Sequence, residues 1–597
     1  MKLVFHAALA CVLLLSLGSF PGWFDSGEFS TVVGVLGVSH PGGHALYVLL
    51  ARLFALIPLG SLDFRTSLFS VFGTLAASWI LWTLAVKASS SRSSWIGAAV
   101  SLGFVLHPSV MLQTVRTEVY ALQAALSLAC VLLTVAWLRT RDVRFGLSLA
   151  LSLGAVTALH PLLALTLSPL LLFAVSARVP YPASKFAKWI PFLFLGTALN
   201  LYVPLRALRN PIVNWDAPVS WKAFAAFGSA RDYSHFMRSP LGLPTGLSSL
   251  LFGPEGIWPL SLLLLALLGV FLLFRTRRRE TVLFSVMLGL TALPLFRGDF
   301  QLRNPDVHAY LMVPVALSLL LAALGAEACA PWLRVPEKGR RFFAFALTSF
   351  TLIWILPTGW RALHAGVSDE AEALASHLDA APVSSAVVVE SDHWLFPLWY
   401  RTYIERRRPD VAVISPLLLK ARWYRERVLE RYGILFERKL FREYALDSDI
   451  YSFGLLASSE PTGQNPAAEF LAVCRERLTN PDPFQIRQFV CSHAVMTAAR
   501  QEVRMKQAIR AVRMLETVLS VPASRKPCDR PEEIRLPFPL VARSSVFLTD
   551  PESLEDTLGL LYLGCRDWGA LTGLAAGREQ RNVNVRLMHS FALARRG

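Results

Sequence analysis

The sequence predicts a polytopic α-helical membrane protein with a C-terminal soluble domain that begins as an α/β fold and continues as mainly helical. Hydrophobic residues make up 54% of the 597-residue chain and charged residues only 17%. Soluble domains carry about 25% charged residues, so an ordinary soluble or disordered chain is excluded. Apolar runs of membrane-spanning length fill residues 1–360, whereas residues 361–597 are polar enough to fold in water.

About eleven apolar runs are candidates to cross the bilayer, which requires about 20 apolar residues in each helix. We expect the first run to be an uncleaved span rather than a signal peptide, because no A-x-A-like site precedes Pro21. A further run, 45–59, is ambiguous because it contains Arg52 and Pro58. The eleven candidates are 3–20, 64–86, 94–107, 119–137, 145–160, 161–177, 189–205, 256–274, 281–296, 308–330 and 342–360.

The ambiguous run determines which side each loop faces. If 45–59 does not cross and Lys2 is cytoplasmic, all five short basic loops face the cytoplasm, as the positive-inside rule requires; if it crosses, all five face outside. We therefore expect 28–59 to form external, interfacial or re-entrant helices. The net charge of +17 then reflects membrane orientation, and we expect no nucleic-acid partner. The loops contain Lys87/Arg92, Arg139/Arg141/Arg144, Arg178/Lys185/Lys188, Arg275/Arg277/Arg278/Arg279 and Arg334/Lys338/Arg340/Arg341.

The same orientation places the C-terminal part of the chain outside. Residues 386–390 and 411–414 are typical of short buried strands, and 394–408 is long enough for a crossover helix between them. Beyond about residue 420 the pattern is mainly helical. We therefore expect a membrane-embedded domain at 1–360, an external α/β segment at 361–430 and an external, mostly helical region at 431–597.

Ionisable and aromatic residues near the external span ends form the candidate site. Charges and histidines at membrane depth are costly, so a set confined to one face indicates a functional site. The set includes Asp25, Glu28, His40, His44, Arg116, Glu118, Tyr120, His160, Arg206, Arg297, Arg303 and Asp306.

Several of these residues also have structural explanations. Asp25 and Glu28 have the spacing of a capping box, which is compatible with a catalytic role because a cap fixes the position of a carboxylate. His40 and His44 could suggest a metal pair, but Pro-Gly-Gly between them breaks the helix that would align them. Glu118 could cap a helix, His160 could separate two spans, and Arg297 and Arg303 could be solvated loop charges.

The stretch Asp25-Ser26-Gly27-Glu28-Phe29, followed by residues 36–47 with His40-Pro41-Gly42-Gly43-His44, resembles the opening signature of the protein O-mannosyltransferase-like family. The resemblance covers roughly residues 20–425. The chain departs from the family's HPPGxPLY pattern at Gly42 and Ala45, where the family has prolines. Weaker matches follow in the expected order: 118–120, His160, 201–206, Asn210-Pro211, Trp215, Asn304-Pro305-Asp306, Tyr310, 392–400 and 408–411.

The resemblance implies a GT-C membrane glycosyltransferase, which takes sugar from a polyprenyl-phosphate carrier. It implies that Asp25, with Glu28, is catalytic: a carboxylate can accept the proton of a hydroxyl that attacks the anomeric carbon, and one displacement inverts that carbon. Arg116, Arg206, Arg297 and Arg303 are candidates to bind the carrier phosphate. His40, His44, Glu118, Tyr120, His160 and Asp306 are the other candidates for substrate binding. No cofactor is required, although a divalent metal is compatible.

The expected partners are a polyprenyl-phosphate-linked sugar, membrane lipid and an exported protein or glycan acceptor. Mannose follows from the family name alone. We expect a multi-pass protein of the bacterial inner membrane, with the site and C-terminal domain facing outside. The alternatives are a transporter or flippase of lipid-linked sugars, for which internal repeats and ionisable groups at mid-bilayer depth would be expected, and a non-catalytic membrane anchor.

Overall fold

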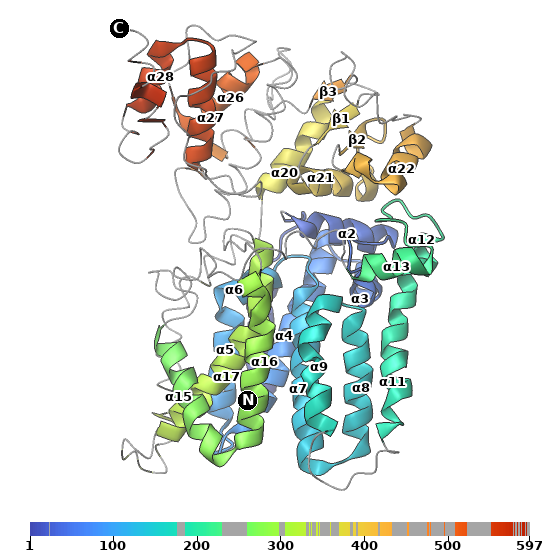
Figure 1. Cartoon of the computed structure of the whole chain (residues 1–597), viewed down its shortest axis with the longest axis vertical. Helices are drawn as coiled ribbons and strands as arrows, with labels where there is room; N and C mark the ends of the chain where they lie inside the picture. The colour runs from blue at the N-terminus through green and yellow to red at the C-terminus, as the bar shows by residue number, and fades with distance from the viewer. Residues whose placement is uncertain are drawn as a thin grey trace. The chain divides into compact units, whose positions relative to one another are not determined.

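The computed structural model forms two compact units, Met1–Val367 and Ser368–Gly597, which are described separately (Figure 1). The described residues are 1–175 except Trp23, 186–229, 260–297, 305–329, 369–381, 386–389, 392–415, 418–432, 450–452, 508–521 and 551–576, with scattered residues between these ranges. The predicted boundaries at 360 and 430 stay predictions.

The first unit is a bundle of helices whose bounds follow the hydropathy pattern. Helices α4, α7, α8, α9 and α11 stand side by side in Figure 1. The elements are α1 (Lys2–Leu14), α2 (Asp25–Val35), α3 (Ala45–Ala55), α4 (Leu62–Ala88), α5 (Ser94–Leu106), α6 (Pro108–Thr114), α7 (Tyr120–Thr140), α8 (Val143–Thr157), α9 (Pro161–Val175), α11 (Trp189–Thr197), the 3-10 helix η1 (Ala198–Leu201), α12 (Tyr202–Ala207), α13 (Trp221–Gly228), α15 (Leu260–Thr276), α16 (Arg278–Arg297), the 3-10 helix η4 (Pro305–Leu311) and α17 (Met312–Cys329).

The bundle is that of an integral multi-pass membrane protein. Among the described residues, four helical segments are long and apolar enough to cross a membrane: Leu62–Ala88, Tyr120–Thr140, Trp189–Ala207 and Asp306–Cys329. A fifth is added if α5 and α6, which meet at a bend of 67°, form one span. Other predicted runs coincide with shorter apolar helices, and 342–360 lies mostly outside the described residues. The count of eleven spans therefore stays a prediction.

The ambiguous run forms a helix that is too short to cross. An 11-residue helix such as α2 or α3 is about 16 Å long, roughly half of a bilayer core about 30 Å thick. Arg52 of α3 donates to the carbonyl oxygens of Gly34 (2.7 Å) and Val33 (3.3 Å) at the end of α2. The charged residue that made this run ambiguous thus binds the carboxyl end of its neighbour, where a cation is favourable.

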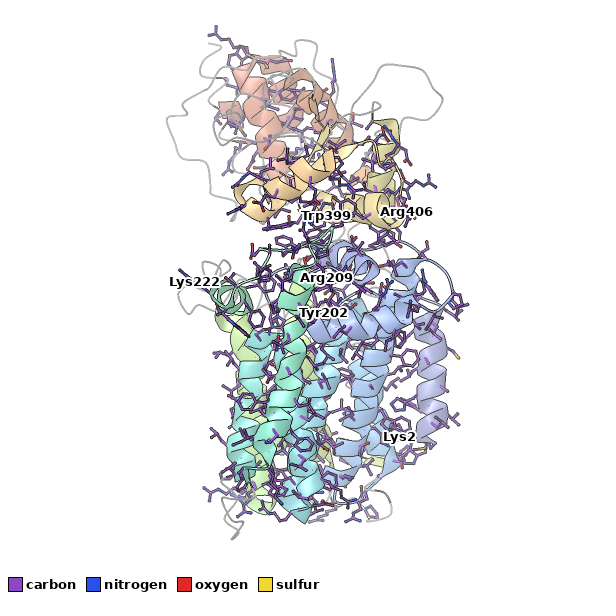
Figure 2. All side chains as sticks on the ribbon, turned by 90° about the vertical axis from the view of Figure 1, so that its right-hand side faces the viewer. Lys2, Tyr202, Arg209, Lys222, Trp399 and Arg406 are labelled. Carbon is purple, nitrogen blue, oxygen red and sulfur yellow. The ribbon has the colours of Figure 1, made fainter. Side chains whose placement is uncertain are left out.

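Basic residues from several predicted cytoplasmic loops meet at one end of the bundle. Arg139, at the end of α7, donates to Glu280 of α16 (3.0 Å) and to the carbonyl of Lys87 at the end of α4 (3.1 Å). Arg277 donates to the carbonyl of Ala88. Lys2, which donates to Thr83 near the end of α4, lies toward this same end, away from Tyr202 and Arg209 (Figure 2).

The second unit contains a small parallel sheet whose strand order is β2-β1-β3. Strand β1 (Ala386–Val388) pairs with β2 (Ala412–Ile414) and with β3 (Ile450–Ser452). A helical connection between β1 and β2 completes the crossover that the sequence suggests. The helices are α20 (Asp369–Ser376), η5 (His377–Ala380), α21 (Asp392–Trp399), the π-helix η6 (Tyr400–Ile404), η7 (Leu418–Lys420), α22 (Arg422–Tyr432), α26 (Ala508–Leu519), α27 (Pro551–Gly564) and α28 (Trp568–Ala575).

Candidate active site

The two acidic residues of the opening motif lie in the first turn of α2. Carboxylates are favourable there because they face the positive end of the helix dipole. The helix begins at Asp25 with Phe24 as its N-cap, so Asp25 lies one position later than the cap that a capping box with Glu28 would use. Glu28 is fully buried, whereas the side chain of Asp25 is 30% exposed. Asp25 is therefore the carboxylate that a substrate can reach.

Both carboxylate oxygens of Glu28 are hydrogen-bonded to His40. The backbone N–H of His40 donates to Oε1 of Glu28 and its ring Nδ1 bonds to Oε2, each at 2.7 Å. Nε2 of the same ring lies 3.9 Å from Oδ2 of Asp25. Burial lowers the pKa of His40, but the charges of Glu28 and Asp25 outweigh it and raise the pKa to about 10. At neutral pH this site therefore holds an imidazolium between two carboxylates.

The loop that carries His40 is held in an unusual backbone conformation. Gly42 has a φ of 115° and Gly43 a φ of 73°. Proline fixes φ near −65°, so proline could not occupy position 42 in this conformation. Glycine at position 42 thus permits a backbone conformation that the proline of the family pattern would exclude. A bridge between Val38 and Asn214 secures the start of this loop.

A series of rings continues from His40 into the bundle. The ring centroids of His40 and His44 are 4.8 Å apart. The ring centroids of His44 and His160 are 5.7 Å apart. The series continues with Tyr120, whose ring centroid lies 5.8 Å from that of His160 and 5.7 Å from that of Tyr310. Burial, with the nearby charge of His40, lowers the pKa of His44 well below its usual value. Neutral His44 thus lies beside charged His40.

A second charged cluster forms around Arg116, which precedes α7. Its Nη2 donates to Glu118 at 3.2 Å and to Asp306 of η4 at 3.1 Å. Arg116 and Glu118 are buried, whereas the Asp306 side chain is 19% exposed. Burial raises the pKa of Glu118 well above its usual value, against the opposing charge of Arg116. Ser26 of α2 donates to Glu118 at 3.5 Å, which links this cluster to the first.

Of the three remaining predicted arginines, only Arg206 has a side chain among the described residues. Arg206 of α12 donates to the carbonyls of Leu36 and Val35, the latter at 3.1 Å, so its guanidinium binds the carboxyl end of α2. Arg297 is the last residue of α16, and its side chain lies outside the described residues. Arg303 also lies outside them. The predicted phosphate contacts of these three residues stay predictions.

Asp25, Glu28 and His40 could also hold a divalent cation. One ligand atom from each lies within 4.8 Å of the others. Both oxygens of Glu28 already accept hydrogen bonds from His40, and the raised pKa of His40 opposes metal binding by its ring. A bound cation would require His40 to lose its proton and Glu28 to change partners. The predicted compatibility with a metal stays a prediction.

One acidic residue near the site was absent from the sequence-based set. Asp63, in the first turn of α4, is buried and accepts hydrogen bonds from Ser30 of α2 and from Thr117. Its signal in the sequence is an acid just before the external end of the span 64–86, the same kind of position that selected Glu118.

The protonation of His40 predicts how stability depends on pH. Its folded-state pKa of about 10 exceeds the ordinary value of 6.5. The protonated ring therefore stabilises the folded state, and this contribution is fully present below pH 6.5. That gain is lost as the pH rises from about 6.5 to about 10. Thermal unfolding of the detergent-purified protein should show a decline in Tm over this range, and His40→Gln should reduce the decline. Equal slopes in the two proteins would contradict the assigned charge.

Comparisons with known proteins show what this chain is similar to. Residues 25–182 match the model of the protein O-mannosyl-transferase TMEM260 N-terminal domain. The mouse (Mus musculus) protein O-mannosyl-transferase TMEM260 is 25% identical over 445 residues, which are 70% of this chain and 63% of the relative. The chain thus spans less than two thirds of that relative's length.

A solved structure shares the fold. Apo ArnT from Cupriavidus metallidurans aligns with a TM-score of 0.50 at 12% identity, over 74% of this chain and 91% of ArnT. The same protein bound to undecaprenyl phosphate aligns at 0.48 and 11% identity, with the same coverage. The chain thus shares its fold with ArnT, and residues 25–182 are similar to the N-terminal domain of the protein O-mannosyl-transferase TMEM260.

Proposed function

We propose that the chain is a membrane glycosyltransferase that moves a sugar from a polyprenyl-phosphate carrier to a hydroxyl group of an external protein or glycan. Mannose is the proposed sugar because the matched family and the mouse relative are named for it. The observation that carries the proposal is the half-buried carboxylate of Asp25 beside the buried Glu28–His40 pair. The carrier follows from the sequence resemblance.

The proposed reaction is a single displacement at the anomeric carbon. The acceptor oxygen forms a bond to that carbon, the bond from the carbon to the phosphate oxygen breaks, and the carrier phosphate leaves with the electron pair. Asp25 takes the acceptor's proton, which is the task of a general base. Attack opposite the leaving group inverts the configuration of the carbon.

His40 and Glu28 would keep this base ready to act. The imidazolium of His40 lies 3.9 Å from Asp25, and Glu28 fixes His40 through one hydrogen bond to its ring and one to its backbone N–H. Arg116 shares its charge between Glu118 and Asp306, so we assign it to positioning and to local charge balance. Stabilisation of the leaving phosphate would then require further cations, for which Arg297 and Arg303 remain the candidates.

We also propose that the site faces the outside of a bacterial inner membrane. What supports this is the gathering of Lys87, Arg139 and Arg277 at one end of the bundle, since the positive-inside rule assigns such an end to the cytoplasm. Asp25 and Arg116 lie at the opposite ends of the spans. The external C-terminal domain is proposed to present the acceptor.

The test compares exported proteins and surface glycans from cells with and without the gene by mass spectrometry. We expect one hexose-type addition to disappear with the gene and to return with the wild-type copy but not with Asp25→Asn. Unchanged proteins and glycans would refute the proposed function.

A further inference from the structure

A network of hydroxyl groups at the start of α4 joins the two clusters of the site. Ser30 follows Glu28 by half a turn of α2 and donates to Oδ1 of Asp63 at 2.6 Å. Thr117 lies between Arg116 and Glu118 and donates to the same oxygen at 2.9 Å. One buried carboxylate oxygen therefore holds a hydroxyl from each of the two site-bearing segments.

Neighbouring residues of α4 reinforce both connections. The hydroxyl of Thr66 lies 2.7 Å from that of Thr117 and 3.3 Å from that of Ser30. Ser67 adds a contact of 3.0 Å to Thr117. One turn further, Ser70 exchanges 3.2 Å hydrogen bonds with the backbone N–H and carbonyl of Glu118. The first two turns of α4 thus form a polar surface that fixes the segment 116–118 against α2.

Asp63 has a position in its helix that suits this role. It lies in the first turn of α4, behind the N-cap Ser61, whose side chain accepts from the N–H of Phe64. A carboxylate there is stabilised by the helix dipole, and the capped turn restricts where it can move. The residue is 3% exposed, so a substrate does not reach it in this structure.

We propose that Asp63 is a positioning residue, which sets the distance between the carboxylates of α2 and the Arg116–Glu118 segment by binding Ser30 and Thr117 through one oxygen. It takes no proton from the acceptor and touches no reacting atom. This proposal rests on the proposed transferase function only where sugar transfer is the quantity measured. Because a misplacement of about 1 Å in a catalytic group costs on the order of 100-fold in rate, the expected effect falls on kcat.

The first test compares two substitutions at position 63. The amide oxygen of Asp63→Asn can still accept both hydroxyl groups, whereas Asp63→Leu can accept neither. We expect Asp63→Leu to lower kcat about 30- to 100-fold with the KM for the lipid donor changed less than about 3-fold. Asp63→Asn should stay within about 5-fold of wild type and keep the wild-type pH profile. Equal losses in the two variants would overturn the proposal.

The second test uses a matched pair of buried threonines, which remains informative where Asp63→Leu does not fold. Thr117→Val removes a hydroxyl bonded to Asp63, and Thr74→Val removes one bonded to Thr114 at 2.9 Å elsewhere on α4. Both changes keep the side-chain shape. We expect a loss in kcat of about 5- to 10-fold for Thr117→Val and less than about 2-fold for Thr74→Val. Similar losses of kcat in both variants would mean that these hydroxyl groups contribute only to the stability of the fold, and would overturn the proposal.

Hydrogen–deuterium exchange tests the positioning role independently of the proposed transferase function, because the measurement requires no enzymatic activity. Thr117→Val and Asp63→Leu should accelerate exchange in residues 25–35 and 115–119, and Thr74→Val should leave 25–35 unchanged. Unaltered exchange in all three variants refutes the positioning role, whatever the activity. A wild-type protein that transfers no sugar, with the expected exchange pattern, refutes the transferase function alone.

Discussion

Asp25→Asn is expected to lower kcat for sugar transfer by about 10²- to 10⁴-fold, the range that a general base contributes. The amide keeps the shape of the carboxylate but cannot take the acceptor's proton. The KM for the lipid-linked donor should change little, because the side chain is proposed to act on the acceptor. Steady-state transfer rates of the purified variant measure both effects.

A matched carboxylate separates this loss from a general effect of removing a charge. Asp142 caps α8 beyond the far end of α7 and pairs with Arg144 at 2.7 Å. Asp142→Asn should retain wild-type kcat, and both variants should unfold at nearly the wild-type temperature. Transfer by Asp25→Asn within about 10-fold of wild type would exclude this residue as the base.

Arg116→Met is expected to destabilise the protein by about 3–5 kcal/mol, because one buried guanidinium is the hydrogen-bonded partner of two carboxyl groups. Without it, Glu118 keeps its burial but loses its counter-charge, and Asp306 loses its 3.1 Å partner. The large effect reflects the charges left behind more than the net strength of the ion pairs. Thermal unfolding and the yield of folded protein in detergent measure it.

Arg144→Met is the control for that substitution. Its guanidinium also pairs with a carboxylate, but its side chain is 85% exposed, and solvent screening leaves such a pair little effect on stability. The double variant Arg116→Met with Glu118→Gln should recover part of the lost stability, since one uncompensated charge is removed. Equal unfolding temperatures for Arg116→Met and Arg144→Met would contradict the buried cluster.

Hydropathy located the four described segments that are long and apolar enough to cross a membrane, because each span has to satisfy its own backbone polar groups and therefore forms one continuous apolar run. The run at 45–59 needed the charge count of the loops as well. The structure resolves it as a short helix whose Arg52 binds α2, a contact between residues too far apart for a local pattern to reveal.

The sequence indicated which candidate residues lie close together, but it did not indicate their hydrogen-bond partners. Asp25, Glu28 and His40 were all candidates from the sequence, although the Asp-x-x-Glu spacing also matched a capping box. Only the fold shows that the ring of His40 is hydrogen-bonded to Glu28. Arg206 was a phosphate candidate because its charge is external. In the structure its guanidinium donates to carbonyl groups at the end of α2, a contact that residue type alone does not predict.

Asp63 was missed for a related reason. Acids near helix starts are common, so its position just before the external end of a span did not distinguish it from an ordinary first-turn acid. Its importance comes from Ser30 and Thr117, two small hydroxyl residues from other segments that meet at one of its oxygens. Serine and threonine are frequent in membrane helices and bond to their own backbone, so no pattern in the sequence marks these two.

The most direct test of the central claim is transfer by the purified, reconstituted protein. Vesicles containing polyprenyl-phosphate mannose labelled in the sugar are supplied with an acceptor protein or glycan fraction from cells that lack the gene. We predict that label moves covalently to the acceptor, with inverted configuration at the anomeric carbon, and that Asp25→Asn vesicles show no such transfer. Label that crosses the vesicle membrane while still attached to its lipid, with none on the acceptor, would contradict the account and identify a flippase.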